Sequence, residues 1–130
     1  MKYTIFKAIK YTYYLSLIVL LILYLFPGSL IGFLLYSDLG KQPNLISNPI
    51  GTSINHLIFF FYLGLLSFII HAKNNKMIYS FPFLICVSVL LELLHSIIPN
   101  RAFELKDLFA NSAGVLSAFF TLIFIKKLKN

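Results

Sequence analysis

Four apolar stretches, each long enough to cross a lipid bilayer as a helix, constrain this chain more than any other feature. They predict helices at approximately 11–35, 54–72, 78–98 and 107–125. A membrane-spanning helix needs about 17–25 residues, and lipid leaves backbone polar groups to be satisfied within the chain, which favours helices. We therefore predict an all-α integral membrane protein, with four transmembrane helices in an antiparallel bundle and a single domain over residues 1–130.

The composition excludes a water-soluble enzyme of this size. Of the 130 residues, 59% are apolar and 12% are charged, whereas a soluble domain carries about 25% charged residues. A small soluble domain buries too little of its surface to hide so much apolar area. Cys86 is the only cysteine, so an intrachain disulfide is excluded, and its apolar surroundings predict a buried side chain.

The first apolar stretch resembles a signal peptide because lysines precede it. It is too long, however, for a signal-peptide core of about 7–15 residues, so we predict that it stays in the protein as a helix. Pro27 and Gly28 interrupt it, and proline in a helix removes a hydrogen-bond donor and clashes with the preceding turn. The pair is expected to kink or end the helix; if the helix ends there, residues 29–35 form a re-entrant or interfacial stretch.

The lysines and the arginine predict the orientation in the membrane. Basic residues that would share one side are Lys2, Lys7, Lys10, Lys73, Lys76, Lys126, Lys127 and Lys129, and those on the other side are Lys41, Arg101 and Lys106. Cytoplasmic segments carry the excess of Lys and Arg, so both termini are predicted to be cytoplasmic in a multi-pass protein of the cell membrane. These residues separate apolar runs, so we expect membrane lipids as partners and no nucleic acid.

Glu92 is the only acidic residue in the interior of a predicted apolar helix, since Asp107 stands at the first position of the fourth. A charge at the centre of a membrane helix costs about 2.5–3.5 kcal/mol on insertion scales, which makes such a residue a candidate for function. With the helix ending near Ile98, Glu92 would lie about 9 Å below that end at 1.5 Å per residue. His95 follows three residues later and shares its helix face.

The predicted fourth helix carries a stripe of polar and small residues. These residues are spaced 4, 3, 4 and 3 apart: Asp107, Asn111, Gly114, Ala118 and Thr121. Small residues let membrane helices approach closely, and polar side chains bond across the contact. Arg101 follows the turn signal Pro99-Asn100 and is placed to reach Glu92 or Asp107 as a bidentate donor. With His56 of the second helix, we predict a polar cluster at the outer leaflet formed by Glu92, His95, Arg101, Asp107, Asn111 and His56.

This cluster allows three interpretations from the residues alone. The first is a structural network that fixes the helices, and the second is a site for a substrate or lipid headgroup. The third is a metal site in which His56, His95 and a carboxylate bind the ion and leave one position open. The chain has no His-Glu-x-x-His run, so we expect no metal and no other cofactor. No serine or cysteine nucleophile stands in a recognisable motif, and we assign no catalytic residue.

The residues from 92 to 114 resemble the signature of the VanZ-like family. That pattern is Glu-x2-Gln-x3-Pro-x-Arg-x5-Asp-x3-Asn-x2-Gly, and this chain matches it in residue and spacing at Glu92, Pro99, Arg101, Asp107, Asn111 and Gly114. Asn55-His56, followed by Phe60 and Tyr62, resembles the family's earlier motif, and the resemblance covers about residues 50–125. Two departures are His95 in place of the usual Gln and the absence of the Asp-Lys that commonly precedes the helix-two histidine.

The resemblance implies a small four-helix protein of the bacterial cell envelope, in a family named for its association with teicoplanin resistance. It implies a role in glycopeptide susceptibility or in surface lipid and cell-wall chemistry, with lipid-linked cell-wall or polysaccharide precursors as possible partners. It does not define a reaction or an oligomeric state. Two other functions stay open: a small proton-coupled transporter that uses Glu92, and a lipid-headgroup-modifying enzyme with His56 or His95 as general base.

Overall fold

The chain folds into helices that run side by side. A computed structural model describes residues 2–44, 46–71 and 77–128. In these residues the helices are α1 (Lys2–Leu25), α2 (Leu30–Tyr36), α3 (Ser53–His71), α4 (Met77–Leu94) and α5 (Leu105–Leu128). The described ranges contain no strand, which confirms the predicted all-α class.

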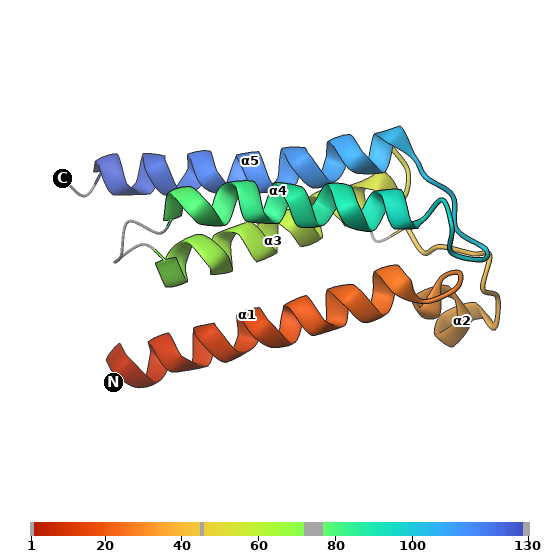
Figure 1. The fold of residues 1–130 in the computed structure, drawn as a ribbon, viewed down its shortest axis with the longest axis horizontal. Coiled ribbons are helices and arrows are strands. Elements are labelled where there is room, and N and C mark those ends of the chain that lie inside the picture. The colour runs from red at the N-terminus through yellow and green to blue at the C-terminus, as the bar shows by residue number, and fades with distance from the viewer. Residues whose placement is uncertain (1, 45, 72–76, 129–130) are drawn as a thin grey trace.

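The long helices alternate in direction (Figure 1). The start of α1 and the end of α5 lie at one end of the bundle, here named the terminal end. The opposite end, named the loop end, holds α2, the segments 37–44 and 46–52, and the connection 95–104. The segments Tyr3–Leu25, Ser53–His71 and Leu105–Leu128 are long and apolar enough to cross a membrane, whereas the apolar helix Ile78–Leu94 is shorter. Lys73, Lys76 and Lys129, which we predicted to be cytoplasmic, lie outside the described residues.

The first apolar stretch forms two helices, so the prediction of one helix over 11–35 is wrong. α1 already begins at Lys2 and ends at Leu25, and the predicted break at Pro27-Gly28 is confirmed. Gly28 takes a positive φ of 85°, a conformation that glycine adopts at little cost. The Ser29 side chain then accepts a hydrogen bond from the Gly32 N–H at 2.9 Å and caps α2.

The other predicted boundaries differ less. α3 agrees with 54–72 as far as His71, and α5 begins two residues before Asp107. α4 ends at Leu94 rather than at Ile98, because the next amides bond three residues back, beginning with His95 N to Glu92 O at 3.1 Å. Proline also disfavours helical backbone in the residue before it, here Ile98. Glu92 therefore lies two residues from the helix end, and the predicted depth of about 9 Å is wrong.

The helices α3 and α5 form the most extensive interface. Gly114 lies where the backbones meet: a Cβ there would collide with the Leu57 carbonyl oxygen and lie 2.8 Å from the Phe61 nitrogen. Further along, a Cβ on Gly64 would lie 2.7 Å from the Ala118 Cβ. The predicted stripe thus faces α3, since Asp107, Asn111, Gly114 and Ala118 are buried.

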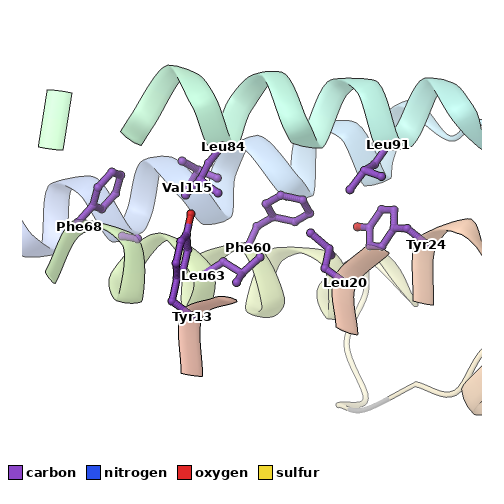
Figure 2. Close-up of a cluster of buried hydrophobic side chains, with 10 residues drawn as sticks. Tyr13, Leu20, Tyr24, Phe60, Leu63, Phe68, Leu84, Leu91 and Val115 are labelled. Atoms are coloured by element: carbon purple, nitrogen blue, oxygen red, sulfur yellow. The ribbon is translucent and has the colours of Figure 1, made fainter. Parts of the chain in front are cut away.

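A row of buried side chains fills the space between the long helices (Figure 2). The row runs from Phe68 and Tyr13 to Leu91 and Tyr24, with Phe60 between them. Cys86 is exposed on the surface of the chain, so its predicted burial is wrong. The residue lies on a face of α4 that the other helices leave uncovered.

Candidate functional site

Tyr24, near the end of α1, is the centre of a buried polar network at the loop end. Its hydroxyl lies 2.6 Å from His56 Nδ1 and donates to Asn111 Oδ1 at 3.0 Å. All three residues are buried. One phenol therefore joins α1 to α3 and α5 in the buried interior of the bundle, where a polar group without a partner is costly.

His95 holds the other side of Tyr24. The two rings are stacked with centroids 5.1 Å apart, and His95 Nε2 donates to the Tyr24 carbonyl oxygen at 3.2 Å. This carbonyl is available because α1 ends at Leu25, and the last four carbonyls of a helix have no partner within it. The early end of α1 thus creates the acceptor that orients His95.

Asp107 lies in the first turn of α5 and contacts two residues of α3. Its Oδ2 is 3.3 Å from His56 Nε2, and its Oδ1 accepts a hydrogen bond from the Ser53 hydroxyl. His56 is therefore held at both ring nitrogens, by Tyr24 on one side and by Asp107 on the other. This arrangement fixes the plane of the imidazole and its distance from α5.

Glu92 is completely buried, with 0% of its surface exposed. Its Oε1 accepts the backbone N–H of Glu104 at 3.1 Å and lies 3.4 Å from His95 Nδ1. Its Oε2 is also buried and has no hydrogen-bond partner. One ligand-type atom from each of His56, Glu92 and Asp107 lies within 4.8 Å of the other two, so these residues are the ones that could hold a metal ion.

Arg101 does not pair with either carboxylate. It donates from Nη2 to the Leu23 carbonyl at 2.7 Å and from Nε to the Phe26 carbonyl at 3.5 Å. The arginine therefore satisfies carbonyls at the end of α1, which the sequence did not predict. Partial burial lowers the pKa of the Arg101 guanidinium, and the charges of Glu92 and Asp107 oppose that shift; the group remains a cation.

A pocket of about 120 Å³ lies beside this network at the loop end. Its apolar wall comes from α1, α2 and α3, and its polar wall includes Tyr24, His56, His95 and Arg101. Gln42 and Pro43 also line the pocket, and Asn55 on α3 holds this segment by donating to the Pro43 carbonyl at 2.7 Å. The pocket thus combines apolar surface with a cation and two imidazoles.

The structure brings together five of the six predicted cluster residues and places the sixth beside them. His56, Glu92, His95, Asp107 and Asn111 share the network, and Arg101 lines the adjoining pocket. The sequence analysis missed Tyr24 and Ser53. Tyr24 could have been recognised, because it is the only residue with a polar side chain between Leu17 and Phe26. The prediction included it only as one residue of an apolar helix.

Comparison with known proteins gives one finding for nearly the whole chain. A family model described as VanZ/LLP1 matches residues 11–126. The match includes α2 to α4, most of α1 and all but the end of α5, so it extends beyond the resemblance that the motifs carry. No curated protein and no solved structure matches the chain.

Proposed function

The chain belongs to the VanZ/LLP1 family, and from this membership we propose that it acts in the bacterial cell membrane by binding the head of a lipid. The ligand class is a membrane lipid or a lipid-linked cell-wall or polysaccharide precursor, held in the pocket at the loop end. Through this binding the protein modulates susceptibility to glycopeptide antibiotics, the role that the family name implies. It is a membrane protein of the VanZ type, and the part of the chain that the structure describes contains three helices of spanning length.

The proposal includes four crossings with the loop end outside the cell. The alternating directions of α1, α3, α4 and α5 support it (Figure 1), as does the apolar character of α4. Lys7, Lys10, Lys126 and Lys127 belong to the parts of α1 and α5 at the terminal end. An excess of basic residues favours the cytoplasmic side for that end.

The observation that carries the proposal is the mixed chemistry of the pocket wall. Leu20, Leu30 and Phe59 offer apolar surface, which suits the carbon atoms of a lipid. Arg101 and the histidines line the same pocket, and an arginine suits the phosphate or carboxylate of a headgroup. Such a pocket near one end of a membrane helix bundle would face the headgroup layer.

The geometry gives the two other functions less support. In the enzyme hypothesis His56 or His95 is a general base, but both ring nitrogens of each histidine contact protein groups. A general base must reach a substrate proton directly or through one water. In the transporter hypothesis Glu92 exchanges protons along a path, yet Glu92 is fully buried and does not line the pocket.

Filling the pocket tests the proposal without removing any polar contact. Leu30→Trp places a large ring in the pocket, whereas Leu34→Trp on the same short helix alters a residue that is 73% exposed and lies outside the pocket. A glycopeptide-susceptible bacterium expressing each variant is scored for growth in teicoplanin. The wild type and Leu34→Trp are expected to lower susceptibility, and Leu30→Trp is expected to behave like the empty vector.

A binding measurement on the same variants separates the ligand sources. Each purified protein is incubated with phosphatidylglycerol vesicles, with or without a lipid-linked peptidoglycan precursor, and retained lipid is identified by native mass spectrometry. Retention by the wild type and Leu34→Trp but not by Leu30→Trp is expected. Equal retention by all three proteins, together with equal susceptibility, would refute the proposed function.

A further inference from the structure

We propose that His56, Glu92 and Asp107 form a binding site for a divalent transition-metal ion, with zinc as the expected occupant. The three residues come from α3, α4 and α5, and each contributes one ligand-type atom within 4.8 Å of the others. Histidine nitrogen and carboxylate oxygen are both zinc ligands, and a site with three protein ligands leaves a fourth position for water or substrate. This site goes beyond the proposed lipid binding and does not depend on it.

The closest pair of atoms already has the spacing of two zinc ligands. His56 Nε2 and Asp107 Oδ2 lie 3.3 Å apart. Zinc binds nitrogen and oxygen at about 2.0–2.2 Å in a tetrahedron, which places neighbouring ligands about 3.3–3.6 Å apart. An ion between these two atoms therefore requires no separation of α3 from α5.

Each proposed ligand is oriented by a second contact on its other polar atom. His56 Nδ1 faces the Tyr24 hydroxyl at 2.6 Å, Asp107 Oδ1 accepts from Ser53, and Glu92 Oε1 accepts from the Glu104 N–H at 3.1 Å. Metal ligands in proteins are usually held in this way by outer hydrogen bonds, which fix the tautomer and the direction of the lone pair. The atoms that remain are His56 Nε2, Asp107 Oδ2 and Glu92 Oε2.

Two of these remaining atoms lack a satisfactory protein partner. Glu92 Oε2 is buried without any hydrogen bond, in a residue with 0% exposure. Tyr24 donates its one hydroxyl proton to Asn111, so the contact with His56 Nδ1 requires the proton to come from the imidazole. Neutral His56 then presents a lone pair from Nε2 to the Asp107 carboxylate, and only a second proton or a cation makes that contact favourable.

The charges at the site favour the cation. Glu92 and Asp107 bring two carboxylates into a region with little exposed surface, where an uncompensated charge is costly. Arg101 directs its hydrogen bonds to carbonyls of α1 instead. A divalent ion would balance both carboxylates at once and is a larger local charge than any side chain supplies.

Zinc binding to the full chain tests the proposal directly. The protein is purified in detergent with a chelator, dialysed against Zn²⁺ alone and analysed for bound metal by mass spectrometry. We expect one ion per chain for the wild type, none above background for Asp107→Asn, Glu92→Gln and His56→Gln, and about tenfold weaker binding for Tyr24→Phe. His71→Gln is the matched control, because this histidine lies at the far end of α3 and its loss should leave binding unchanged.

Cobalt gives a measurement that does not depend on any variant folding. Wild-type protein loaded with Co²⁺ should show the intense visible absorption of a four-coordinate site, and zinc should displace it. No retained metal in the wild type would overturn the proposal. An equal loss of binding in His71→Gln would overturn it too. Metal binding with unchanged lipid retention in every variant would leave the site in place and separate it from the proposed function.

Discussion

Both ends of the helix bundle contain fully buried side chains, but the side chains differ in their chemistry. At the terminal end aromatic rings meet, with Phe68 and Phe119 centroids 5.6 Å apart and Phe81 and Phe119 centroids 5.3 Å apart. At the loop end the same depth of burial holds carboxylates, imidazoles and a phenol. Phe68 and Glu92 both have 0% of their surface exposed.

The difference shows which contacts determine how the helices are arranged. Lipid tails are as apolar as phenylalanine, so aromatic packing at the terminal end competes with lipid that offers similar contacts. A buried carboxylate or imidazole finds no substitute in lipid tails, so its partners must come from neighbouring helices. We infer that the loop end fixes the relative positions of α1, α3, α4 and α5, and that the terminal end mainly fills space.

The largest effect is expected from Gly114→Ala, in the contact between α5 and α3. The added Cβ would collide with backbone atoms of Leu57 and Phe61, and backbone cannot turn away as a side chain can. We expect a loss of about 3 kcal/mol, at the upper part of the usual range for overpacking. The measurement is the free energy of unfolding in detergent, determined by SDS titration.

Two other glycines serve as controls for this substitution. Gly64→Ala brings a Cβ too close to one side-chain atom, the Ala118 Cβ at 2.7 Å, and its other neighbours are at 3.7 Å. We therefore expect a smaller loss of stability than for Gly114→Ala. Gly40→Ala has its closest contact at 3.4 Å, with Asp38 Oδ1, and should change little. If Gly114→Ala were no more destabilising than Gly40→Ala, the close approach of α3 and α5 would be wrong.

The second largest effect is expected from Tyr24→Phe at the loop end, and Tyr13→Phe nearer the terminal end is its comparison. Each substitution removes one hydroxyl group. Tyr24→Phe leaves buried His56 and Asn111 without their shared partner, and an unsatisfied buried polar group costs about 1–3 kcal/mol. Tyr13→Phe removes the same atom from a buried tyrosine of the same helix nearer the terminal end. We expect Tyr24→Phe to lower the free energy of unfolding more, and equal losses would contradict the role of the loop end.

Much of this fold could be predicted because hydrophobic length is a local property of the sequence. For α3 and α5, the length of the apolar stretch and the residues on either side of it indicate where the helix begins and ends. The predicted bounds of these two helices therefore agree closely with the structure. The ends of α1 and α4 were harder to place. There, proline and tight turns compete with apolar residues that favour continuing the helix, and contacts with other segments decide the outcome.

The candidate site was predictable in its members but not in its pairings. The spacing of Asp107 and Asn111 places both on one helix face, and that face is indeed buried. The partner of Arg101 depends on where α1 ends, because the arginine binds carbonyls that a longer helix would have occupied. Tyr24 was missed because its neighbours in the sequence are apolar. Its polar role depends on His56 and Asn111, which lie on other helices.

The smallest effect is expected from Ser16→Ala, a polar contact between helices that lies outside the network. The Ser16 hydroxyl is 3.1 Å from the Tyr62 hydroxyl, in an exposed position between α1 and α3. Serine in a helix can bond instead to a carbonyl of the preceding turn, so we expect a loss below about 0.6 kcal/mol, the average for such bonds in membranes. Tyr62→Phe should have the same small effect in the same SDS titration. A loss as large as that of Tyr24→Phe would show that burial at the loop end is not what gives polar contacts their strength.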